Sequence, residues 1–102
     1  MNIRASQDLI RETYFKHDMK RGLLNTWEWF KSEVYELEEA IENRDDNQIR
    51  EELADVYAWL LSIANLLDID LEHAFISRYG DGCPKCSSTP CICEFRSNPR
   101  SP

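Results

Sequence analysis

The sequence predicts an all-α fold: an antiparallel bundle of three to four helices that oligomerises through helix packing, followed by a short cysteine-rich tail. Residues 23 to 79 contain neither glycine nor proline, the two residues that most often interrupt helices. Within this stretch apolar residues recur at steps of three and four, the period of an amphipathic helix. With 102 residues, 42% of them hydrophobic, the chain suits one compact domain and leaves little for a second.

The first helix is expected from about Ile3 to His17, before residues 20 to 22 (Lys-Arg-Gly) break the pattern. Asn25, followed three residues later by Glu28, resembles a capping box, so the second helix is expected to begin there. Its apolar residues form one stripe: Trp27, Phe30, Val34, Leu37 and Ile41.

A polar break at residues 43 to 46 precedes the third helix, with Asp45 or Asp46 placed to cap it. The apolar stripe then repeats in Ile49, Leu53, Val56, Leu60, Ala64 and Leu67. Two long helices joined by a short turn should lie antiparallel, each burying its stripe against the other. A fourth, shorter helix is expected from Leu71 to about Tyr79, capped by Asp70. We therefore expect a helical domain of residues 1–80 and a separate tail of residues 81–102.

The formal net charge is −7, and residues 28 to 55 alone hold eleven acidic and three basic side chains. This balance argues against nucleic acid or an anionic membrane as a partner, because both require a basic face. It favours a cation instead. No apolar run approaches the roughly 20 residues that span a bilayer, and the N-terminus lacks the apolar stretch of a secretion signal. A cytoplasmic location is expected.

The aromatic residues exceed what two apolar stripes can hide. Trp29, Tyr35, Tyr57 and Trp59 fall outside the main stripes, so they either line a pocket or bury against another subunit. Because small bundles are marginally stable as monomers, a homodimer or homotetramer is expected.

Four carboxylates form two pairs on the second and third helices. Glu33 and Glu36 are three residues apart, as are Glu52 and Asp55, and side chains at this spacing share a helix face. Folding the hairpin brings both pairs to one spot, where they would repel without a hard cation such as Mg²⁺, or Mn²⁺ in its place. Carboxylates at this spacing are also ordinary on solvated faces. However, both pairs border the apolar stripe, and no Lys or Arg is placed four residues away to neutralise them.

The segments that carry these pairs resemble a known family. SEVYELEEAI at residues 32–41 and EELADVYAWLLSIANLLDIDLEHA at residues 51–74 are similar to the MazG-like branch of the all-α nucleoside triphosphate pyrophosphohydrolases, relatives of the dimeric dUTPases. The family pattern is E-x-x-E, a spacer, then E-x-x-D, and fifteen residues separate Glu36 from Glu52 here. Ser32 departs from the pattern, since many members carry a glutamate at that position. This removes an auxiliary carboxylate and leaves the number of metal ions open.

The resemblance implies a hydrolase that cleaves a nucleoside triphosphate between its α and β phosphates, giving monophosphate and pyrophosphate. Mg²⁺ would be held by Glu33, Glu36, Glu52 and Asp55, with Glu36 or Glu33 accepting the proton of the attacking water. Lys20, Arg21 and Arg78 would balance charge on the leaving group, and Asn65 matches a polar position near the nucleotide. Trp29 and Trp59, each one turn from a carboxylate pair, could sandwich the base.

The tail contains the pattern C-x2-C-x4-C-x-C, formed by Cys83, Cys86, Cys91 and Cys93. Four thiolates can close a tetrahedral structural Zn²⁺ site, although the second pair is more tightly spaced than usual. A redox pair or reactive thiols are the alternatives. With one aromatic residue, Phe95, the tail does not support a stacking platform for nucleic acid. The competing interpretation of the whole chain is a non-catalytic acidic interaction module whose zinc-bound tail docks a partner.

Overall fold

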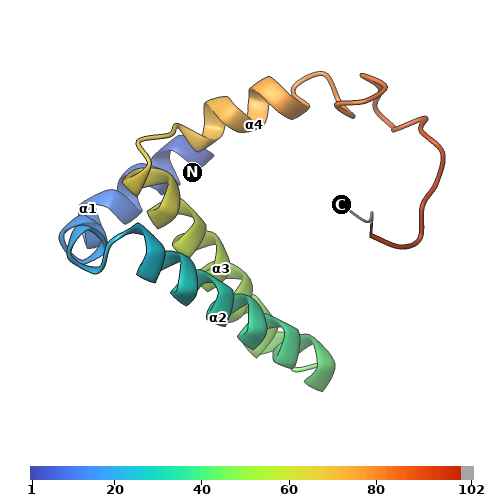
Figure 1. Cartoon of the computed structure of the whole chain (residues 1–102). Helices are drawn as coiled ribbons and strands as arrows, with labels where there is room; N and C mark the ends of the chain where they lie inside the picture. The colour runs from blue at the N-terminus through green and yellow to red at the C-terminus, as the bar shows by residue number, and fades with distance from the viewer. Residues whose placement is uncertain (100–102) are drawn as a thin grey trace. The chain divides into compact units, whose positions relative to one another are not determined.

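The computed structural model describes residues 1–99 and places four helices and no strand in this range (Figure 1). The helices are α1 (Ile3–Arg21), α2 (Leu23–Asn43), α3 (Asp46–Leu66) and α4 (Leu71–Tyr79). The all-α class predicted from the sequence is therefore confirmed. The chain divides into two compact units, Met1–Glu72 and a second that begins at His73, and each is described by itself.

The junction between α1 and α2 is shorter than the sequence predicted. Both helices extend to Gly22, which alone separates them with φ 84° and ψ 164°. The expected start of α2 at Asn25 is wrong, because the Asn25 side-chain amide donates to the Arg21 carbonyl instead of capping a helix. The freedom of one glycine at positive φ replaces the longer break that was expected.

The turn between α2 and α3 forms as the sequence predicted. Arg44, at φ 53°, ends α2, and its N–H donates to the carbonyls of Ala40 and Ile41. Asp45 caps α3 by accepting a hydrogen bond from the Gln48 N–H at 3.2 Å, which satisfies an orphan donor of the first turn. The two helices run antiparallel and side by side (Figure 1).

α1 packs chiefly against α3, and a buried polar network fixes its position. Gln7, almost completely buried, donates to the Ile69 carbonyl at 2.7 Å and accepts from the Leu71 N–H at 3.0 Å. Asn65 donates from its side-chain amide to the Gln7 carbonyl at 3.2 Å. Because each of these buried groups has a partner, the network stabilises the α1–α3 contact.

The apolar stripes are only partly covered within one chain. Among residues 1–99, the buried hydrophobic side chains are Ala40, Leu61 and Ala64. By contrast, Val34 is 42% exposed and Ile41 54% exposed, although both belong to the α2 stripe. One hairpin plus α1 therefore covers one side of each stripe and leaves the other open. No helix in the described range is long and apolar enough to cross a membrane.

Candidate active site

Three of the four predicted carboxylates meet between α2 and α3. Glu33, Glu36 and Glu52 each offer an oxygen atom that lies within 4.8 Å of the others. The i, i+3 spacing places the first two on one face of α2, and the antiparallel hairpin brings Glu52 opposite them. The convergence expected from the sequence is therefore present in these three side chains.

Asp55 lies outside this closest set, yet its charge acts on it. Burial, followed by the charges of Glu36, Asp55 and Glu52, raises the pKa of Glu33 from 4.5 to about 7. Burial, Glu36 and Asp55 also raise the pKa of Glu52. The apoprotein thus disfavours full ionisation of the cluster, since desolvation and like charges both oppose it.

The cluster has the properties of a cation site. Glu33 Oε2 and Glu52 Oε2 are buried without a hydrogen-bond partner, and across residues 1–99 no basic side chain forms an ion pair with any of the four carboxylates. Oxygen atoms desolvated in this way need a cation or a proton. Because all the donors are carboxylates, the set fits a hard divalent ion such as Mg²⁺.

A pocket of about 200 Å³ lies between α1 and α3 and has Asp55, one of the four carboxylates, in its lining. Arg21 lies at its edge, where its Nη1 donates to Asp18 Oδ1 at 2.8 Å and to Thr26 Oγ1 at 3.3 Å. The guanidinium also lies 4.7 Å from the ring centroid of Trp59, a cation–π distance. The pocket is lined by Tyr14, Asp18, Arg21, Asp55, Ala58, Trp59 and Ser62.

The structure stacks Trp29 and Trp59 on each other. Their ring centroids are 5.8 Å apart and their planes differ by 8°, so a base could lie between them only if the rings separated. The Arg21 guanidinium also contacts the Trp59 ring. Trp29 is 53% exposed and lines a second open pocket with Asn25 and Ser32, which leaves one aromatic face available for stacking.

The remaining predicted substrate residues are more scattered. Lys20 is exposed in the last turn of α1. Asn65 is buried at the Gln7 network, ten residues along α3 from Asp55 and hence about 15 Å away along the helix. Arg78 lies in α4 with its guanidinium over the Tyr79 ring at 5.9 Å and belongs to the second unit. Of these three residues, only Lys20 is on the helix that contributes Arg21.

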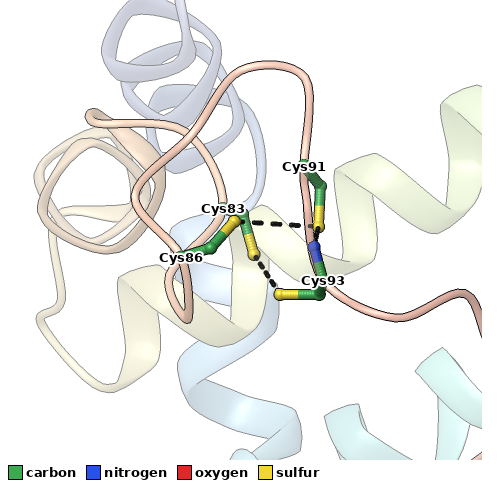
Figure 2. A group of neighbouring side chains, drawn as sticks. All are labelled: Cys83, Cys86, Cys91 and Cys93. Carbon is green, nitrogen blue, oxygen red and sulfur yellow. Dashed lines mark hydrogen bonds between the residues drawn. The ribbon is translucent and has the colours of Figure 1, made fainter.

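The four cysteines of the tail converge on one point (Figure 2). The Sγ atoms of Cys83 and Cys93 are 3.8 Å apart, and those of Cys86 and Cys91 are 3.9 Å apart. A tetrahedral ion with metal–sulfur bonds of about 2.3 Å requires sulfur–sulfur edges of about 3.8 Å. The spacing therefore matches a four-sulfur metal site, and all four thiols are free.

Backbone N–H groups surround these sulfur atoms. The Ile92 N–H, followed by that of Ser88, lowers the pKa of the Cys86 thiol to about 6, and the N–H groups of Cys86 and Lys85 lower the pKa of Cys83. The neighbouring sulfurs, Cys91 first, raise the pKa of Cys93 to about 12. Without a cation the cluster therefore holds some thiolates but resists complete ionisation.

The fold and the site together define a class: all-α proteins with an E-x-x-E and E-x-x-D carboxylate hairpin. Residues 21–86 match the family model of the MazG nucleotide pyrophosphohydrolase domain. The match covers more than half of the chain, so the chain belongs to this family, as the sequence motifs indicated. A comparison with curated proteins found no match.

Sequence reasoning did not single out Asp18, a charged residue in the lining of the pocket. Its side chain lies beside Arg21 and faces the pocket. The sequence expectation ended the first helix at His17 and so placed Asp18 in a break. The available signal was the i, i+3 spacing of Asp18 and Arg21, which on a continuous helix predicts an ion pair.

Proposed function

We propose that the chain is a Mg²⁺-dependent nucleoside triphosphate pyrophosphohydrolase that converts a (d)NTP and water to the (d)NMP and pyrophosphate. Within this proposal it removes unwanted nucleotides from the cytoplasmic pool. The observation that carries it is the meeting of Glu33, Glu36 and Glu52, with two buried carboxylate oxygens left unpartnered. Family membership supports the same reaction class.

Glu33, Glu36 and Glu52 would hold the ion, with Asp55 completing the set; Mn²⁺ could take the same place. When bound, Mg²⁺ supplies neutralisation of phosphate oxygens and an activated water. Water attacks the α phosphorus, the bond to the bridging oxygen breaks, and pyrophosphate leaves. Glu33 or Glu36 accepts the water proton.

Basic side chains balance the charge on the leaving group. Arg21 is the best placed, because Asp18 and Trp59 hold its guanidinium at the edge of the pocket next to Asp55. Lys20 and Arg78 remain in this role as parts of the proposal. Base stacking falls to the open face of Trp29 or to the Trp29–Trp59 pair after the rings separate, with Asn65 as a positioning residue of the α1–α3 packing.

Release of pyrophosphate tests the proposal. Purified protein with Mg²⁺ and a panel of NTPs and dNTPs should release pyrophosphate, and Glu36→Gln and Asp55→Asn should each abolish turnover while circular dichroism shows unchanged helix content. Glu39→Gln, an exposed glutamate on the same helix, is the matched control and should retain full activity. Release of orthophosphate alone, or of nothing from any nucleotide, would overturn the proposal.

The competing function is a non-catalytic acidic interaction module. It predicts neither Mg²⁺ binding at the carboxylates nor loss of function after single carboxylate substitutions. Calorimetric titration of Mg²⁺, with and without a non-hydrolysable nucleotide, separates the two: the hydrolase requires Mg²⁺ binding that Glu36→Gln weakens.

We also propose that the chain works as a homodimer or homotetramer. The support is the half-covered α2 and α3 stripes, whose exposed members include Val34, Ile41 and Leu53. A second hairpin packed on these faces would complete a four-helix arrangement and bury both stripes.

For the cysteine cluster we propose a structural Zn²⁺. The two sulfur–sulfur distances match a tetrahedral edge, and the Ile92 and Cys93 N–H groups point at sulfurs at 3.4 Å. Those donors stabilise the negative charge of four coordinated thiolates. Since all four positions are filled by sulfur, such an ion leaves no open site for substrate and contributes to folding.

Metal analysis of untagged protein tests the zinc proposal. About one zinc per chain is expected, lost in Cys83→Ser and Cys91→Ser but kept in Glu36→Gln. Removal of the metal with a chelator should disorder the tail, which faster amide hydrogen exchange in the tail would detect. The helix content measured by circular dichroism should not change. A protein that carries iron instead, or two disulfides detected by mass spectrometry, would contradict zinc.

A further inference from the structure

Asp18 is a buried carboxylate with one unused oxygen. The residue is 1% exposed. Its Oδ1 accepts from Arg21, but Oδ2 is buried and has no hydrogen-bond partner. Desolvating a carboxylate oxygen without a donor is costly, and such orphan atoms in folded proteins call for an explanation. Arg21 is already engaged through Oδ1, so it does not supply a donor for Oδ2.

The unused oxygen belongs to a side chain that lines the pocket beside the carboxylate cluster. The same pocket is lined by Asp55, at the metal side, and by Trp59, one turn further along α3. At about 200 Å³ it is smaller than the roughly 300–1,000 Å³ of pockets that enclose a complete drug-sized ligand. It therefore suits one part of a nucleotide. Arg21 stands at the edge of the pocket, where the phosphates would lie, and the Asp18 carboxylate in the lining disfavours a phosphate inside it. The nucleoside part is what remains.

We propose that Asp18 is a specificity-determining residue that accepts a hydrogen bond from an O–H or N–H donor of the nucleoside part of the substrate. The proposal rests on the proposed function, because it places the phosphates at Glu33, Glu36 and Glu52. An ionised carboxylate can only accept hydrogen bonds, so the ligand group must be a donor. Two groups of a nucleotide have this chemistry: the sugar hydroxyls and the N–H groups of the base.

Arg21 has a second role in this arrangement. It holds Asp18 Oδ1 at 2.8 Å and also contacts Thr26 and the Trp59 ring, so the carboxylate is held in one orientation while its Oδ2 keeps no partner. A site of this kind rejects a substrate that lacks the matching donor, because the buried oxygen would then stay unpaired.

Steady-state kinetics with matched nucleotides test the proposal and distinguish the two donors. One series keeps the base and changes the sugar from ribose to 2′-deoxyribose to 2′,3′-dideoxyribose. The other keeps the sugar and removes or methylates the N–H groups of the base. In one series, the nucleotide that lacks the donor should have a kcat/KM about 10- to 100-fold lower than the nucleotide that carries it. In the other series, kcat/KM should stay the same.

Asp18→Asn should abolish that discrimination, lowering kcat/KM more for nucleotides that carry the donor than for the donor-free analogue, since the amide retains the shape but presents a donor. Asp8→Asn, half exposed on the same helix and paired with Arg4, is the control and should leave the discrimination intact. If Asp18→Asn lowers kcat/KM for every nucleotide by the same factor, Asp18 acts only through Arg21 and the proposal fails. It also fails if wild-type discrimination survives the substitution, or if no analogue in either series is discriminated by the wild type.

A binding measurement separates this failure from failure of the proposed function. If wild-type protein hydrolyses no nucleotide, the proposed reaction is wrong, and calorimetry with nucleoside monophosphates then tests the pocket directly. Weaker binding of the donor-free monophosphate, removed by Asp18→Asn, would still support the role of Asp18. Equal binding of both monophosphates by the wild type would overturn it. Where Asp18→Asn does not fold, the wild-type analogue series alone decides.

Discussion

Glu33 combines burial with three carboxylate neighbours, and its pKa of about 7 makes it the side chain most sensitive to pH near neutrality. Its pKa in an unfolded chain is the ordinary 4.5. Between these values the folded protein binds more protons than the unfolded one, so the metal-free protein loses stability as the pH rises from about 4.5 to about 7. A bound cation neutralises the carboxylates and so removes the cause of the raised Glu33 pKa. The stability of the metal-bound protein should therefore rise, and not fall, with increasing pH.

We predict that the free energy of unfolding of the metal-free protein, measured in the presence of a chelator, falls by about 2 kcal/mol between about pH 5 and about pH 8. Urea unfolding at the two pH values measures it. Glu33→Gln should flatten most of the change, leaving the smaller part that comes from Glu52, and saturating Mg²⁺ should stabilise the wild type more at the higher pH. Equal pH dependence of wild type and Glu33→Gln would contradict this assignment.

At the residue scale, the sequence predicted which side chains meet better than it predicted what surrounds them. The spacing of Glu33, Glu36 and Glu52 follows from helical geometry, so a hairpin was enough to bring them together. The contacts of Trp59 with Trp29 and with Arg21 depend on how α1 lies across α3. Contacts of that kind come from tertiary packing, and no local pattern in the sequence encodes them.

At the scale of the elements, Gly22 separates two helices that would otherwise continue into each other. Its φ of 84° and ψ of 164° lie in a region that is essentially restricted to glycine. Nothing lies within 4 Å of a Cβ built there, so a substitution would act through backbone strain and not through a clash. Gly22→Ala should lower the free energy of unfolding by about 1–3 kcal/mol. A change below about 0.5 kcal/mol in urea unfolding would show that the junction relaxes at little cost.

The two capping residues expected from the sequence provide a matched pair. Asp45 accepts from the Gln48 N–H at the start of α3, whereas Asn25 donates from the first turn of α2 back to the carbonyl of Arg21, the last residue of α1, and caps no helix start. Asp45→Ala should therefore cost about 1 kcal/mol, and Asn25→Ala should be close to neutral. Thermal or urea unfolding of both variants measures the difference. A larger loss of stability in Asn25→Ala than in Asp45→Ala would show that Asn25 caps α2.

For the whole molecule, the number of helices and their antiparallel order were predictable from two apolar stripes, one polar turn and a glycine-free stretch. The extent of burial was not. Each stripe was expected to be covered by the other helix, but Val34 and Ile41 remain about half exposed. The apolar face of a helix is wider than the strip that one neighbouring helix covers. A pair of helices therefore buries one side of each apolar face and leaves the other side for further helices. A second chain is the source of those helices in the homo-oligomer that we propose.

We predict that the protein has at least twice its 12.0 kDa chain mass in sedimentation velocity, with a melting temperature that rises with protein concentration, as mass action requires. Val34→Asp should shift the protein to the monomer mass, because a carboxylate would be buried without a partner in the interface. Glu39→Gln, exposed on another side of α2, should leave the mass unchanged. A wild-type protein that sediments at the mass of one chain across the concentration range would show that the open stripes have another role. Loss of pyrophosphate release in the Val34→Asp monomer, with its Mg²⁺ binding retained, would mean that a neighbouring subunit completes the active site.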